Sequence, residues 1–122
     1  MITIDEMQLI LDELAEELPA AFYHELNGGI LLLPETRMSP YAKADDLYIL
    51  GEYRINGAMG RYIVIYYGSF ERAFGGLDED AMKNKLRHTL RHEFRHHLES
   101  LSGERGLELE DDDYIRKYLG GM

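Results

Sequence analysis

Residues 78–102, DEDAMKNKLRHTLRHEFRHHLESLS, contain neither proline nor glycine and predict one long helix. Asp78 is a suitable N-cap, Glu79 and Asp80 are favourable in a first turn, and Gly103 predicts the helix end. Apolar residues recur at helical spacing and form one stripe: Met82, Leu86, Leu90, Phe94, Leu98 and Leu101. We expect this stripe to pack on the core and the helix to be the central element of the fold.

The sequence before this helix predicts further helices and a small sheet. Thr3 and Glu6 have the spacing of a capping box, which predicts a helix that Pro19 interrupts. A short second helix is expected at 20–26 and a loop at 68–76, while a last short helix is expected near the C-terminus, at 114–119. Three strands are predicted, at 30–33, 47–50 and 61–67. The last two would form an antiparallel pair, with a connection too long for a tight hairpin.

Length and composition limit the class of protein. A chain of 122 residues with 45% hydrophobic and 30% charged residues is typical of a single globular domain, which we expect to span residues 1–122. The formal net charge of −10 argues against a nucleic-acid partner. No apolar stretch approaches the roughly 20 residues of a membrane span, so we expect no membrane association. The chain has no cysteine and opens on no signal peptide, which favours a cytoplasmic location. Nothing in the sequence indicates an oligomeric state.

A basic ridge runs along the long helix. Arg87, Arg91 and Arg95 recur every fourth residue and therefore lie on one face. The simpler interpretation is a solvated face paired with some of the abundant carboxylates. The alternative is a surface for an acidic ligand.

The long helix also contains His92-Glu93-Phe94-Arg95-His96, an HExxH sequence. Side chains four residues apart lie on one helix face, so both imidazoles can reach a single ion. Zinc binds neutral imidazole nitrogens, and a carboxylate beside the first ligand can take a proton from zinc-bound water. His92 and His96 point more than 90° away from the apolar stripe, unlike core histidines. We therefore predict that they bind Zn²⁺, with Glu93 as the general base.

The remaining histidines and the third metal ligand are less specified by the sequence. His97 falls within the apolar stripe, which favours a core or supporting role, whereas His88 is expected at the surface and His24 has no metal-ligand spacing.

Glu99 is seven residues after His92 on the same helix, about 10 Å away and too far to share one ion. We choose Glu104 as the third metal ligand, because the chain can turn back towards the metal after Gly103. The other available carboxylates are Glu108, Glu110 and Asp111 to Asp113.

Tyrosines enrich the strand predicted at 61–67. Tyr62, Tyr66 or Tyr67 is a candidate to stabilise an oxyanion, although tyrosines in strands more often simply pack. If this strand lies at a sheet edge beside the metal helix, it can pair with an extended peptide.

Together these residues resemble the bacterial minimal zincin-like metallopeptidase family. The likeness rests on LRHTLRHEFRHHLESLSGERGLELED (86–111), LYILGEY (47–53), RYIVIYYGSF (61–70) and ELNGGILLLPE (25–35). It implies a minimal zincin-like α+β fold: N-terminal helices, a small mixed or antiparallel sheet of about three strands, the HExxH helix and a short C-terminal helix. It also implies metal binding by His92 and His96 and the base role of Glu93. Leu98-Glu99 stands where Phe-Gly is common in that family.

The leading functional hypothesis is a zinc-dependent metallopeptidase that hydrolyses a peptide bond with metal-activated water. Its partners would be peptide or protein substrates. The main alternative is a zincin fold that serves as a non-catalytic metal-binding or regulatory module. A third hypothesis is an interaction protein in which the HExxH sequence arises by chance and the basic ridge binds the partner.

Overall fold

The computed structural model describes residues 1–40 and 47–105, the last two by their backbone only. Its described elements follow one another as helix, strands and helices. In order, they are α1 (Ile4–Glu16), the 3-10 helix η1 (Ala20–Tyr23), β1 (Gly29–Leu33), β2 (Gly51–Asn56), β3 (Gly60–Tyr66), α2 (Tyr67–Phe74) and α3 (Glu79–Arg105). The protein is therefore an α+β protein with a small mixed sheet, as the sequence predicts.

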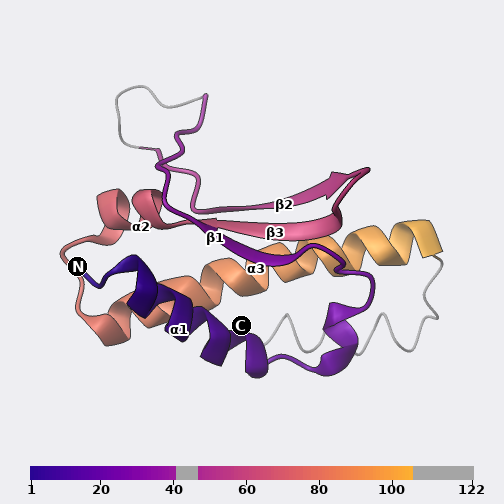
Figure 1. The fold of residues 1–122 in the computed structure, drawn as a ribbon, viewed down its shortest axis with the longest axis horizontal. Helices are drawn as coiled ribbons and strands as arrows, with labels where there is room; N and C mark the ends of the chain where they lie inside the picture. Colours follow the sequence, from indigo (N-terminus) through magenta and orange to yellow (C-terminus); the bar gives the residue numbers. More distant parts are fainter. Residues whose placement is uncertain (41–46, 106–122) are drawn as a thin grey trace.

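The sheet has the strand order β1-β3-β2, so β3 is its central strand. β3 pairs in parallel with β1 and antiparallel with β2. α1 and α3 lie together along one side of the sheet (Figure 1). Ile63 and Ile65 of β3 join the apolar residues of these two helices in the main core. The opposite face of β3 carries a second, smaller cluster around Val64. The described part of the chain has no helix with the length and apolar character needed to cross a membrane.

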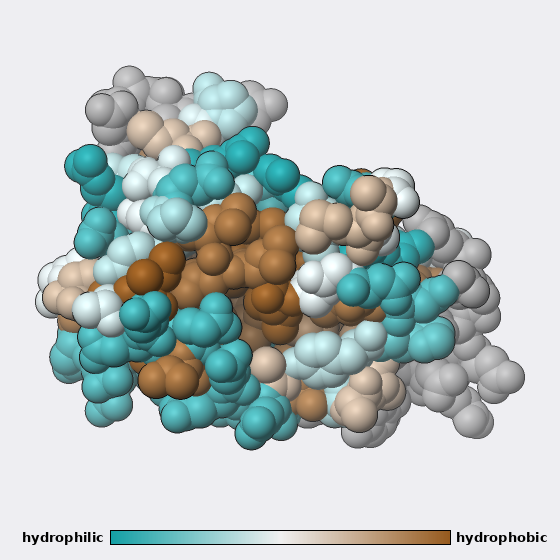
Figure 2. All heavy atoms as spheres, in the orientation of Figure 1, coloured by the Kyte–Doolittle hydropathy of each residue, from teal (hydrophilic) through white to brown (hydrophobic). Residues whose placement is uncertain are grey.

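The outer edge of β1 is apolar and partly exposed. Ile30 to Leu33 are all half-buried, and hydrophilic residues surround the apolar area that β1 forms in the middle of the face in Figure 2. Because β3 pairs with only one side of β1, this strand is one edge of the described sheet. β2 is the other edge.

The predicted helix caps are confirmed. The Thr3 hydroxyl accepts a hydrogen bond from the Glu6 amide at 3.1 Å, and the Glu6 carboxylate accepts one from the Thr3 amide at 2.9 Å. Asp78 Oδ1 accepts a hydrogen bond from the Ala81 amide at 2.8 Å at the start of α3. The apolar stripe of α3 is buried along its whole length. The predicted end of this helix at Gly103 is wrong, since α3 continues to Arg105. One glycine costs a helix about 1 kcal/mol, which the flanking turns can offset.

The second strand lies further along the chain than predicted. Residues 47–50 contribute only an isolated bridge between Tyr48 and Met38, whereas Gly51–Asn56, predicted as a connection, forms β2. The turn to β3 is also tight, contrary to the prediction. Asn56 Oδ1 accepts hydrogen bonds from the amides of Ala58 and Met59 at 2.7 and 3.0 Å, and Gly60 takes a positive φ of 72°. Glycine takes a positive φ without steric cost, which suits Gly60 to the point where the chain leaves this turn.

Two other segments differ from the sequence prediction. The loop predicted at 68–76 is largely helical, as α2, and this helix buries Phe70. The helix predicted at 20–26 shortens to the 3-10 turn η1. The helix predicted at 114–119 lies outside the described residues.

Gly68 of α2 packs directly on the segment that follows β1. A Cβ atom there would lie 2.7 Å from the Glu35 carbonyl carbon and would overlap the Thr36 hydroxyl. We expect Gly68→Ala to lower the free energy of unfolding by about 1–3 kcal/mol, because backbone must move to make room. Gly76→Ala is the matched control, since its Cβ would meet nothing within 4 Å. Urea denaturation measures the free energy of unfolding of both variants, and equal values would contradict this packing.

Candidate functional site

His92 and His96 face each other one turn apart on α3. Their Nε2 atoms are 3.2 Å apart, and their ring planes are nearly perpendicular at 86°. Both side chains are exposed, as expected for residues that lie off the buried stripe. The structure thus brings together the two predicted metal ligands.

Glu93 lies between this histidine pair and the core. Its side chain is only 6% exposed, and no described residue donates a hydrogen bond to its carboxyl group. Burial raises the pKa of Glu93 to about 7, and the nearby negative charge of Glu52 adds to the effect. A carboxyl group with a pKa near neutrality can both accept and donate a proton at physiological pH.

The three residues open onto a cavity of about 450 Å³ between α3 and the edge strand β2. The β2 side of this cavity consists of Gly51, Glu52 and Tyr53. A second cavity, of about 320 Å³, continues past Gly51 towards His88 and Thr89. The histidine pair therefore lies in a groove whose second wall is an edge strand.

The outer edge of β2 carries backbone hydrogen-bonding groups that do not pair with β3. The Tyr66 amide donates to the Leu50 carbonyl at 3.0 Å, which places Leu50 in a hydrogen-bonded pair with β3. Such pairs alternate along antiparallel strands, so the amide and carbonyl of Gly51 and Tyr53 point away from β3. Gly51 allows β2 to lie close to α3, since a Cβ there would lie 3.2 Å from Thr89 Cγ2.

A partly buried chain of hydrogen bonds joins β2 to α3 beside the cavity. His97 is fully buried, and its Nε2 lies 2.8 Å from the His24 carbonyl oxygen, which can only accept. In the neutral imidazole, His97 Nδ1 therefore accepts a hydrogen bond from the Tyr53 hydroxyl, whose oxygen lies 2.9 Å away. Arg61 donates to the same Tyr53 oxygen at 3.1 Å and to Ser100 at 2.5 Å. His97 is thus a satisfied core histidine that supports the site, as its place in the stripe predicts.

The histidine pair fits one shared cation. Two nitrogens bound to a tetrahedral zinc ion at 2.0–2.1 Å are about 3.3 Å apart, close to the observed 3.2 Å. The pKa of His92 is lowered, first by burial and then by the charges of His96, His88 and Arg95. A lowered pKa keeps the imidazole neutral, which is the form that binds metal.

Within the described residues, no group of three His, Cys, Asp or Glu side chains is placed to hold a metal ion. The side chain of Glu104 lies outside this part of the chain, but its backbone belongs to α3. Eight residues of helix separate it from His96, a rise of about 12 Å. The turn on which the choice of Glu104 relied is therefore absent at Gly103. The acidic residues Glu108 to Asp113 lie outside the described residues.

The tyrosines predicted for the oxyanion do not line the cavity. Tyr62 and Tyr66 are buried on the face of β3 opposite the helices. Tyr66 is connected to the site only through Glu52, whose carboxylate accepts a hydrogen bond from the Tyr66 hydroxyl at 3.1 Å. Tyr67 starts α2 and donates to the Ile2 carbonyl at 2.6 Å. The strand predicted at 61–67, for which an edge position was considered, is the central strand β3. The edge beside α3 is β2.

Sequence reasoning did not select the β2 residues that line the cavity. Glu52 and Tyr53 were within a segment predicted as a connection, and their only signal was the stretch LYILGEY in the family resemblance. His88 is exposed as expected, yet it lines the second cavity.

The basic ridge of α3 pairs with α1. Arg87 donates two hydrogen bonds to the Glu17 carboxylate at 2.9 and 3.0 Å, and Arg91 lies 3.6 Å from the same group. For these two residues the structure confirms the interpretation of a solvated, ion-paired face.

The fold and the site define a small α+β protein with an exposed histidine pair and a buried glutamate beside an edge strand. No protein-family model and no curated protein matches the chain. Its structure is similar to the solved structure of a conserved hypothetical protein from Thermus thermophilus, with a TM-score of 0.67 and 34% sequence identity. The match covers 83% of this chain and 98% of the other. The chain belongs to the same family as that conserved hypothetical protein.

The raised pKa of Glu93 predicts a pH-dependent stability of the metal-free protein. The unfolded chain loses this proton near pH 4.5 and the folded protein near pH 7, so the ionised carboxylate destabilises the fold increasingly between these values. We expect Glu93→Gln to raise the free energy of unfolding by about 1–3 kcal/mol at pH 8, and by much less at pH 5. Urea denaturation with a chelator present measures this. The control is Glu99→Gln, at an exposed carboxylate of the same helix. A gain that does not change with pH would contradict the assignment.

Proposed function

We propose that the protein is a zinc-dependent metallopeptidase, or a closely related metallohydrolase, with a zincin-like site. The observation that supports it best is the convergence of His92 Nε2 and His96 Nε2 at 3.2 Å over a cavity that the buried Glu93 carboxyl group also lines. A pair of surface histidines alone would support metal binding only. The buried carboxyl group would add a base, and the outer edge of β2, which pairs with no other described strand, would add a place for a peptide.

His92 and His96 would hold the ion through Nε2. The third ligand predicted from the sequence is Glu104, whose side chain lies outside the described residues. When bound, zinc polarises a carbonyl group and lowers the pKa of its water towards about 7. The lowered pKa of His92, caused by burial and by its charged neighbours, favours the neutral imidazole that binds metal.

Glu93 is the residue that moves the proton. Its carboxylate accepts a proton from the attacking water and delivers it to the leaving amine nitrogen. A pKa near 7 suits both steps, since the group is then neither too weak a base nor too weak an acid. Its low exposure also excludes bulk water, which strengthens its electrostatic interactions within the cavity.

An extended substrate would lie along the outer edge of β2. The amide and carbonyl groups of Gly51 and Tyr53 supply the backbone hydrogen bonds, as in other cases where a peptide adds a strand to a sheet. This arrangement places a peptide carbonyl beside the histidine pair, because Gly51 and Tyr53 line the same cavity as His92 and His96. We therefore propose peptides or unfolded protein segments as substrates.

The first prediction of this proposal concerns the metal. We expect the purified protein, without a polyhistidine tag, to bind one zinc ion, and His92→Ala or His96→Ala to weaken binding by at least on the order of 100-fold, since each removes a direct ligand. Competition with a chromogenic chelator measures the affinity.

His88→Ala is the matched control, because His88 is exposed one turn before His92 on the same helix. Replacing Glu104 and each acidic residue from 108 to 113 in turn would identify the third ligand. Unchanged affinity in both His92→Ala and His96→Ala would rule out this metal site.

The second prediction concerns turnover. Glu93→Gln keeps the shape of the side chain but removes the base, so we expect zinc binding to be retained and peptide hydrolysis to fall by about 100-fold or more. Mass spectrometry of a diverse peptide library incubated with zinc-loaded protein measures hydrolysis. Hydrolysis at the same rate by Glu93→Gln and the unaltered protein would contradict the base role of Glu93, whereas no hydrolysis by either would favour the non-catalytic metal-binding module.

A further inference from the structure

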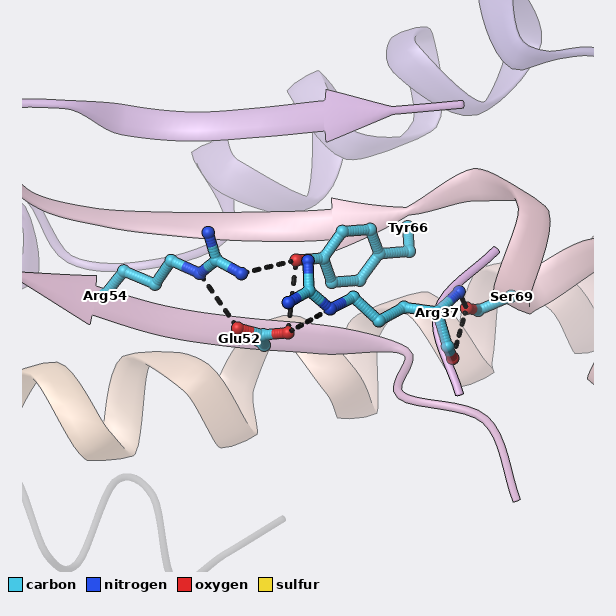
Figure 3. A network of polar contacts seen from close by, with 5 residues as sticks. All are labelled: Arg37, Glu52, Arg54, Tyr66 and Ser69. Carbon is cyan, nitrogen blue, oxygen red and sulfur yellow. Dashed lines mark hydrogen bonds and ion pairs between the residues drawn. The ribbon is translucent and has the colours of Figure 1, made fainter. Parts of the chain in front are cut away.

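Two arginines surround Glu52 at the edge of the candidate site. Arg54 Nε lies 2.8 Å from Glu52 Oε2, and Arg37 Nε lies 3.4 Å from Glu52 Oε1. Tyr66 completes the network, since its hydroxyl donates to Glu52 and accepts a hydrogen bond from Arg54 Nη2 at 3.2 Å (Figure 3). Two positive charges therefore share one negative charge in a protein whose net charge is −10.

Further contacts hold Arg37 in this network. The backbone amide of Arg37 donates to the fully buried Ser69 hydroxyl at 2.8 Å, and the same hydroxyl donates back to the Arg37 carbonyl at 3.2 Å. The guanidinium of Arg37 lies 5.7 Å from the centre of the Tyr66 ring, within the range of a cation–π contact. These contacts hold Arg37 beside β2, although its side chain remains 44% exposed.

The network has more hydrogen-bond donors than hydrogen-bond acceptors. A guanidinium has five N–H donors, and each arginine contacts Glu52 through Nε alone. Neither terminal nitrogen of Arg37 has a hydrogen bond to a described residue, and Figure 3 draws only the Nε atom of its guanidinium joined to Glu52. Both Glu52 oxygens already have partners. A further ligand here must therefore supply acceptors, and a carboxylate is the acceptor that matches a guanidinium fork.

The register of β2 places this network within reach of a bound peptide. Tyr53 points to the α3 side, where its hydroxyl meets His97, so Glu52 and Arg54 point to the opposite face. Residues opposite each other on paired strands share a face, with Cβ atoms about 4.5–5.5 Å apart. The peptide residue that pairs opposite Glu52 therefore directs its side chain to the two arginines. Glu52 also lines the cavity of the histidine pair, so this residue lies close to the bond that would be cleaved.

We propose that Arg37 and Arg54 form a subsite for a carboxylate of the substrate, either an acidic side chain or the C-terminal carboxylate of a short peptide. This inference rests on the proposed function, because it assumes a peptide along β2. It narrows the substrate class to peptides with a negative charge close to the scissile bond.

Fluorescein-labelled octapeptide pools, each with Glu or Gln fixed at one position and the others randomised, test this subsite. We expect Glu to bind about fivefold to tenfold more tightly than Gln at one position, as measured by fluorescence anisotropy at low salt, and the preference to weaken as salt is added. A parallel set with a free or amidated C-terminus tests the other source of carboxylate. Binding is measured on Glu93→Gln protein with and without zinc, so that hydrolysis does not intervene.

Arg37→Gln should abolish the preference, whereas Arg72→Gln, at an exposed arginine of α2, should retain it. Equal affinity for Glu and Gln pools at every position, or a preference that survives in Arg37→Gln, would overturn the subsite even if the protein cleaves peptides. An Arg37-dependent preference in a protein that never cleaves would support the subsite and remove the peptidase proposal. Failure to bind any pool would overturn both.

Discussion

The contact between β2 and α3 is the constraint on which the candidate site depends. Gly51 lets the strand approach Thr89, and Tyr53 ties it to the helix through a 2.9 Å hydrogen bond to His97. His97 is itself fixed by the His24 carbonyl in the interior. The width of the groove beside the histidine pair is therefore set by packed and hydrogen-bonded groups. A site built this way is positioned before any ligand arrives, which lowers the cost of binding.

The helical part of this arrangement could be predicted from the sequence because its signals are local. Periodic apolar residues and the Asp78 cap give the position of α3, and a separation of four residues puts His92 and His96 on one face. The burial of His97 follows from its place in the stripe. These predictions need only the geometry of one helix, and tertiary contacts reinforce that geometry.

The wall opposite the helix could not be predicted in the same way. β2 has the sequence GEYRIN, whose glycine and charged residues have low strand propensity, so its pairing with β3 comes from tertiary context. The predicted strand Leu47–Leu50 is more apolar but contributes only one bridge. The argument for Glu104 relied on a helix end at Gly103, which the structure does not show, so its role as third ligand stays a prediction. A glycine near a helix terminus permits an end but does not enforce one when the next turn is stable.

The position of Glu93 explains how one helix can supply both the proposed metal ligands and the proposed base. At 100° per residue, Glu93 points between the direction of His92 and His96 and the direction of the apolar stripe. Metal ligands must be neutral and reachable from solvent, whereas a base with a pKa near 7 must lose most of its hydration. Both conditions hold at the line where a buried helix face meets an open groove. His92 and His96 lie on its exposed side, and Glu93, at 6% exposure, lies on its buried side with its carboxyl group still open to the cavity. A small domain can therefore assemble these groups without a second lobe, provided that an edge strand forms the other wall.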